Sequence, residues 1–91
     1  MTAKQDAIRA IYAQVTAPQW AAPNLDGLAD VLRDLSWLPE GLVPITLPDL
    51  GGLSADDRAA LLHVLAEAVA ESVDSPRPVR VERGDTTPRP R

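Results

Sequence analysis

Residues 24–37, with the sequence NLDGLADVLRDLSW, constrain the fold of this chain more than any other segment. Asp26, Asp30 and Asp34 are spaced by four residues, so on a helix they line up along the exposed side. Like charges at this spacing cost an isolated helix about 0.2 to 0.5 kcal/mol each. The leucines recur at spacings of three, four and three residues, which places one apolar stripe over a core: Leu25, Leu28, Leu32 and Leu35. The segment therefore predicts an amphipathic helix whose outer face favours a cationic partner.

Residues that begin or break helices set the other boundaries in the first half of the chain. A first helix is expected over about residues 4–15, because Pro18 cannot continue it. Asn24 is a favourable N-cap for the second helix, which is expected to extend to Trp37. Residues 42–47 predict a short strand, LVPITL. Pro44 removes a ladder donor from it, so this strand should lie at a sheet edge or contain a bulge.

The second half predicts a long helix followed by a strand. Ser54 and Asp57 form a candidate capping box, and the helix should extend to about Ser72. Val79 and Val81 alternate with charged residues, which is typical of a half-buried strand. The buried face of the helix is expected to contain Leu61, Leu62, Leu65, Ala68 and Val69. Because strand, helix and strand follow one another, a parallel crossover is favoured. The predicted fold class is α/β, with three main helices packed on a small parallel sheet.

Composition limits the size and the class of the protein. Ninety-one residues suffice for one small domain, which we expect to span residues 1–83, and residues 84–91 are expected to form a disordered tail rich in proline and arginine. The absence of cysteine excludes a disulfide framework and thiolate metal sites. The N-terminal segment carries charges and no long apolar run, so we expect neither a signal peptide nor a membrane span, and a cytoplasmic location.

Charge is distributed unevenly along the chain. Residues 1–75 contain four basic and eleven acidic residues, a net charge of −7, whereas residues 76–91 contain five arginines and two acidic residues, a net charge of +3. An acidic body repels nucleic acid and attracts basic surfaces. A nucleic-acid-binding role for the basic end is the weaker interpretation, because that end contains no aromatic residue.

The run NLDGLADVLRDLSW, followed by LPEG and a short apolar strand, resembles the barstar family of intracellular ribonuclease inhibitors. The resemblance extends from roughly Asp6 to Glu82 and includes Pro18, Trp20 and the stretch HVLAEA of the third helix. It implies a monomeric inhibitor that blocks the active site of a small secreted ribonuclease in a 1:1 complex. It implies no enzymatic activity, no cofactor and no direct contact with nucleic acid or membrane.

The resemblance also implies which residues meet the partner. In the family, the second helix and the loop before it enter the substrate cleft, where their carboxylates occupy the positions of RNA phosphates. Asp30 would be the principal phosphate mimic with Asp26 beside it, and Glu67 would add a peripheral charge pair. Trp20 stands where the family has a tyrosine that packs on the nuclease. The expected partner-binding residues are Trp20, Asn24, Asp26, Ala29, Asp30, Arg33 and Glu67.

Three features depart from the family pattern. Members usually begin with a strand, whereas this chain opens almost directly into a helix, and a sheet of two strands is marginal alone. Ala29 stands where the best-known member has a tryptophan, which removes a large contact from the interface. Two extra residues precede Trp37, which we expect to belong to the core.

Other functions fit parts of the same pattern. An acidic helix face is often only solvated, and paired carboxylates can act as general acid and base in an enzyme. Both carboxylates here lie on an outer helix face, however, without a third group to give them different roles. His63 and Glu67 have a spacing that could seat a metal, but no further ligand is evident. The main alternative is a barstar-like binding module for a different basic protein or toxin.

Overall fold

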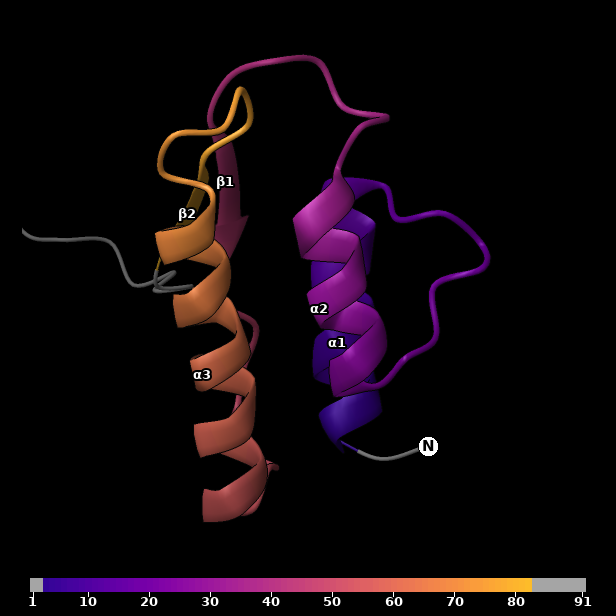
Figure 1. Cartoon of the computed structure of the whole chain (residues 1–91). Helices are drawn as coiled ribbons and strands as arrows, with labels where there is room; N and C mark the ends of the chain where they lie inside the picture. The colour runs from indigo at the N-terminus through magenta and orange to yellow at the C-terminus, as the bar shows by residue number, and fades with distance from the viewer. Residues whose placement is uncertain (1–2, 83–91) are drawn as a thin grey trace, which may run out of the picture.

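The computed structural model describes residues 3–82 of the chain. Its elements, in chain order, are α1 (Ala3–Val15), α2 (Leu25–Asp34), β1 (Val43–Thr46), α3 (Ala55–Glu71) and β2 (Val79–Glu82). The predicted order of helices and strands and the α/β fold class are therefore confirmed. In Figure 1, α2 and α3 lie side by side in one layer, with α1 and the strands behind them. The tail expected over residues 84–91 lies outside the described residues.

The two strands pair in parallel, as the strand–helix–strand order predicts. Val43 lies opposite Val79 and Ile45 lies opposite Val81. The N–H groups of Val43 and Leu47 donate to carbonyl groups at the two ends of β2. Pro44 occupies the alternate position, so its missing N–H faces away from β2 and costs no ladder bond. The predicted edge position of this strand is confirmed.

A side chain of α1 covers the other edge of β1. Gln14 Nε2 donates to the Thr46 carbonyl at 2.7 Å, and the Thr46 N–H donates to Gln14 Oε1, also at 2.7 Å. One side-chain amide therefore satisfies both backbone groups that Thr46 would offer to a further strand. Because Pro44 has no N–H to offer at this edge, little remains there for another strand to pair with. This contact explains how β1 is completed although residues 3–82 contain no strand before α1.

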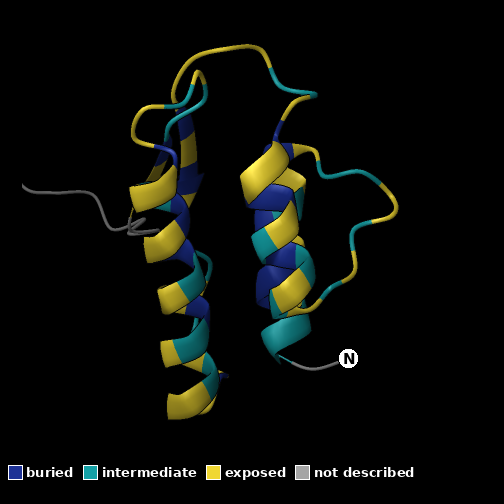
Figure 2. Cartoon of the chain, viewed as in Figure 1, coloured by how far each residue is buried: buried dark blue, intermediate teal, exposed yellow. Residues whose placement is uncertain are grey.

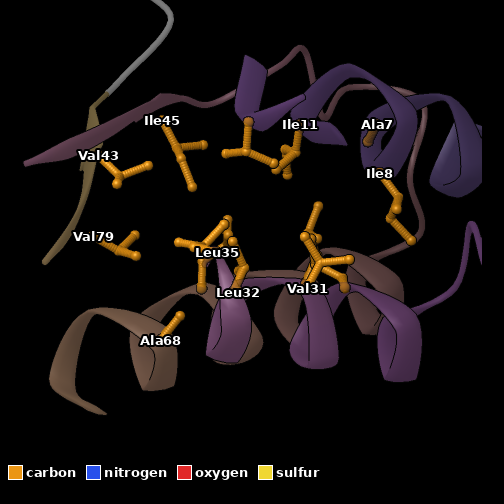
Figure 3. Close-up of a cluster of buried hydrophobic side chains, with 14 of the residues drawn as sticks. Ala7, Ile8, Ile11, Val31, Leu32, Leu35, Val43, Ile45, Ala68 and Val79 are labelled. Carbon is orange, nitrogen blue, oxygen red and sulfur yellow. The ribbon is translucent and has the colours of Figure 1, made fainter. Parts of the chain in front are cut away.

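The core lies between the two layers. Figure 3 shows side chains from α1, β1 and β2 facing side chains from α2 and α3. In Figure 2 the buried residues gather on the inward sides of the helices, while their outer sides are exposed. The predicted leucine stripe of α2 is confirmed, with Leu28, Leu32 and Leu35 buried and Leu25 partly buried against the cluster. The largest fully buried side chains are Ile8, Ile11, Leu28, Leu35, Ile45, Leu61 and Leu65.

The predicted end of α2 at Trp37 is wrong. The helix ends at Asp34, because Leu35 adopts the left-handed conformation with φ of 48° and its N–H bonds to the Val31 carbonyl. This turn directs Leu35 into the core and redirects the chain. The indole of Trp37 then donates to the Val15 carbonyl at 2.8 Å and packs, partly buried, on the core. The expectation that Trp37 serves the core is confirmed.

The start of α3 matches half of the predicted capping box. Ser54 Oγ accepts from the Asp57 N–H at 3.1 Å, as an N-cap does. The Asp57 carboxylate lies 3.8 Å from Lys4 Nζ. This pair brings the first turns of α3 and α1 together.

The buried face of α3 is narrower than predicted. Leu61, Leu65 and Ala68 are buried and Val69 is partly buried, but Leu62 is exposed, so its assignment to the core is wrong. Successive helical residues are rotated by about 100°, and with Leu61 facing the core Leu62 turns outward. At 17 residues α3 is the longest described helix, and no helix within residues 3–82 is long and apolar enough to cross a membrane.

Replacing Gln14 tests whether its amide completes β1. Gln14→Met keeps the side-chain length but removes both bonds to Thr46, so we expect a loss of about 1 to 2 kcal/mol in the free energy of unfolding. The uncovered edge should also promote self-association. Urea denaturation and sedimentation velocity measure the two effects. Gln19→Met, in the exposed loop before α2, is the control, and equal behaviour of the two variants would contradict the assignment.

Candidate partner-binding surface

The outer face of α2 carries the acidic ridge, which we define as Asp26, Asp30 and Asp34. All three residues lie within the helix and all are exposed. Asn24 starts the helix, since its backbone is extended and its side-chain oxygen accepts from the Gly27 N–H at 2.7 Å. Asp26 lies in the first turn, where the helix dipole favours a negative charge. The same burial that holds the leucines inward therefore presents the carboxylates outward.

Asp30 is linked to α3 through Arg33. Arg33 Nη1 lies 3.6 Å from Asp30 Oδ1, and Arg33 Nε lies 3.7 Å from Glu71 Oε1. The ridge and the exposed side of α3 thus form one continuous charged surface. Ala29 lies one turn before Arg33 on the same side of α2 and is partly buried, so no large side chain stands between Asp26 and Asp30 there.

The loop before α2 is held in place by contacts with α1. The Tyr12 hydroxyl donates to the Ala22 carbonyl, and the Ala17 N–H donates to the Tyr12 carbonyl. A Cβ on Gly27 would collide with the Ala22 carbonyl oxygen and would lie 3.0 Å from the Tyr12 hydroxyl. Glycine is therefore required where α2 passes this loop. Trp20 stands on the same loop with 62% of its surface exposed.

Glu67 belongs to the neighbouring face of α3. Its carboxylate lies 3.5 Å from His63 Nε2, and Glu71 follows one turn later on the same stripe. Since Arg33 reaches Glu71, this stripe lies on the side of α3 that adjoins α2. Within residues 3–82 no group of three or more His, Cys, Asp or Glu side chains is arranged to hold a metal ion.

Comparison of the sequence with known protein families identifies the family of the chain. The sequence model described as barstar (barnase inhibitor) matches residues 1–83. The chain belongs to the barstar family. No curated protein and no solved structure matches it. At the level of the family, the function is inhibition of a barnase-type ribonuclease, and members are inhibitors rather than enzymes.

In this barstar-family chain, the loop and α2 bring together most of the residues that the sequence singles out for partner binding. Asn24, Asp26, Ala29, Asp30 and Arg33 follow one another along α2 and its cap. Trp20 lies on the loop that leads into the helix, and Glu67 lies on the adjoining stripe of α3.

Sequence reasoning missed two residues of this surface, Tyr12 and Glu71. Burial raises the pKa of the Tyr12 hydroxyl above its ordinary value of 10.0, and the nearby Asp30 carboxylate raises it further. Tyr12 therefore connects the loop, the ridge and α1. Glu71 had a signal in its spacing of four from Glu67, but its contact with Arg33 depends on how α2 and α3 pack.

An open groove of about 220 Å³ lies beyond the ridge, at the carboxyl ends of α2 and α3. Arg77 lines it and also donates from Nε to the Leu38 carbonyl at 2.7 Å, which ties the segment before β2 to the segment after α2. The groove is lined by Leu32, Arg33, Asp34, Leu35, Ala68, Glu71, Ser72, Ser75, Pro76 and Arg77. Neither Asp26 nor Asp30 belongs to this lining, so the groove adjoins the ridge without enclosing its first two carboxylates.

Gly27→Ala separates packing from helix propensity. Propensity alone favours alanine over glycine by about 1 kcal/mol inside a helix. We expect Gly27→Ala to lower the free energy of unfolding instead, by about 1 to 3 kcal/mol, because the new methyl group collides with the Ala22 carbonyl oxygen. Chemical denaturation gives the free energy of unfolding. A variant more stable than the wild type would show that the loop yields and is not held against α2.

Tyr12 reports on Asp30, because it is the single tyrosine of the chain. Asp30→Asn should lower the pKa of Tyr12, since the carboxylate contributes to raising it. The raised pKa means that neutral Tyr12 stabilises the fold below pH 10, and that this stabilisation is lost as pH rises through the folded-state pKa. Ultraviolet absorbance of the tyrosinate measures the shift. Asp34→Asn, two turns from the loop end of α2, is the control, and equal shifts in both variants would contradict the assignment.

Proposed function

We propose that this barstar-family chain is a cytoplasmic inhibitor of a small, secreted-type, guanyl-specific ribonuclease. The proposed mechanism is reversible occlusion in a 1:1 complex. In it, α2 and the loop before it enter the substrate cleft, and Asp30 and Asp26 take the places of RNA phosphates. Trp20 would pack on the rim of the cleft, while Arg33 and Glu67 would lie at the edge of the contact.

One observation carries this proposal: Asp30 and Asp26 are exposed, one turn apart, on a helix whose preceding loop is fixed by Tyr12 and Gly27. A site that binds a phosphodiester must present arginine, lysine or histidine. A carboxylate held in a defined position offers such groups charge-assisted hydrogen bonds. Because loop and helix are ordered before binding, less conformational entropy is lost on association.

The charge of the chain supports the same function. Residues 1–75 carry a net charge of −7, and such a body is attracted to the basic cleft of a nuclease over distances of about a Debye length, roughly 10 Å at moderate salt. The exposed ridge directs part of this charge toward the partner. Electrostatic attraction of this kind speeds association more than it slows dissociation.

Ala29 favours a second candidate, a barstar-like module for a different basic protein or toxin. A small side chain between Asp26 and Asp30 gives the partner no aromatic surface at the centre of the ridge. Interfaces commonly depend on buried aromatic or arginine side chains for much of their binding energy. A target that requires an aromatic contact at this position would bind the chain weakly. The two candidate functions therefore use the same binding surface and differ only in the partner.

Inhibition of RNA cleavage tests the first candidate. Purified protein is titrated into a panel of small guanyl-specific ribonucleases, and the wild type should inhibit at least one of them. Asp30→Ala should weaken that inhibition by about 2 to 5 kcal/mol, because it leaves the partner's cation buried without its carboxylate. This range rests partly on measurements of the barnase–barstar complex itself. Asp56→Ala, on the first turn of α3, removes the same charge elsewhere and should change inhibition little.

The outcomes distinguish the two candidates. Cleavage that is unchanged by the wild type across the panel would reject ribonuclease inhibition. Capture of a basic protein without nuclease activity, released by Asp30→Ala but not by Asp56→Ala, would instead support the second candidate.

A further inference from the structure

Arg33 is a cation placed between two carboxylates of the binding surface. Its Nη1 atom lies 3.6 Å from Asp30 and its Nε atom lies 3.7 Å from Glu71. Both distances exceed the roughly 2.7 to 2.9 Å of a charge-assisted hydrogen bond. The three side chains are 57% to 67% exposed, so solvent screens both pairs. Arg33 is therefore shared between Asp30 and Glu71 and held firmly by neither.

This arrangement affects any binding through Asp30. While Arg33 remains beside Asp30, it neutralises part of the charge that would attract a partner, and a partner cation must compete with it. If Arg33 had no other neighbour, the competition would leave an unpaired arginine at the edge of the interface. Because Arg33 is largely exposed, the cost is that of an exposed ion pair, about 0.2 to 1 kcal/mol.

Glu71 and the groove give Arg33 a second position. The groove of about 220 Å³ includes Arg33, Asp34 and Glu71 in its lining. It lies at the carboxyl ends of α2 and α3, where both helix dipoles favour a positive charge. Arg33 can therefore leave Asp30, remain beside Glu71 and stay in a favourable potential.

We propose that Arg33 is a transferable counter-ion that adjusts how strongly the ridge binds a cationic partner. In the free protein it is shared by Asp30 and Glu71, and on binding it passes to Glu71 while a cationic side chain of the partner takes its place at Asp30. A surface whose cation is weak or poorly placed displaces Arg33 less completely and binds less tightly. This inference rests on the proposed ribonuclease inhibition and adds a specificity-determining role for Arg33, with Glu71 acting through Arg33.

A double-mutant cycle tests the transfer, using a ribonuclease that the wild type inhibits. Arg33→Gln removes the competitor and should tighten inhibition about two- to five-fold, the range of exposed ion pairs. Glu71→Gln removes the second position and should weaken inhibition by a similar factor. In the Arg33→Gln background, Glu71→Gln should have almost no effect, because there is no arginine left to receive.

Three controls support the cycle. Arg58→Gln makes the same charge change at the opposite end of α3, so it corrects for the general effect of net charge on association. Arg33→Lys keeps the positive charge, so its inhibition constant should lie within about twofold of that of the wild type. This variant distinguishes the effect of the charge from an effect of the substitution on folding. Circular dichroism establishes that each variant is folded.

The possible results separate the inference from the proposed function. If Glu71→Gln weakens inhibition equally with and without Arg33, Glu71 contacts the partner itself and the transfer is wrong. Weaker inhibition by Arg33→Gln means that Arg33 binds the partner directly, which also overturns it. Failure of the wild type to inhibit any ribonuclease rejects the proposed function, and the inference falls with it.

Discussion

Burial of one face of α2 is the constraint on which the rest of the structure depends. Leu28, Val31, Leu32 and Leu35 pack into the core between the two layers, and this packing stabilises a ten-residue helix that would be marginal alone. The same packing determines the rotation of the helix about its axis. Asp26, Asp30 and Asp34 face solvent because the apolar residues cannot, and their mutual repulsion is tolerated because core burial outweighs it.

Local pattern predicted the elements of this fold and the inner and outer faces of α2. Apolar periodicity identified the helices, Asn24 and Ser54 marked the caps of the second and third helices, and the alternation of apolar and charged residues identified the second strand. Each of these signals depends on residues that are close in sequence. The same reasoning failed for Leu62 and for the end of α2, where tertiary packing selects the conformation. A left-handed Leu35 is unfavourable locally and persists because its side chain becomes buried.

The candidate site shows the same division between local and long-range information. The ridge residues could be assigned from spacing and from resemblance to the barstar family, and the family match over residues 1–83 confirms that resemblance. The contacts of Arg33 with Glu71, and of Tyr12 with Ala22, join residues that are far apart in sequence. Arg33 contacts Asp30 as well as Glu71, so the surroundings of Asp30 depend on contacts that the motif does not contain.

The last turn of α1 links fold and site. Within four residues, Tyr12 holds the loop that carries Trp20, Gln14 completes the edge of β1, and the Val15 carbonyl receives the Trp37 indole. The sheet edge and the binding loop are thus positioned by one rigid helix, although they lie at different places in the chain. Within residues 3–82 the sheet has two strands, and α1 covers the outer edge of β1 and packs against it. The helix that covers the edge of β1 is therefore the same element that orders the proposed binding surface.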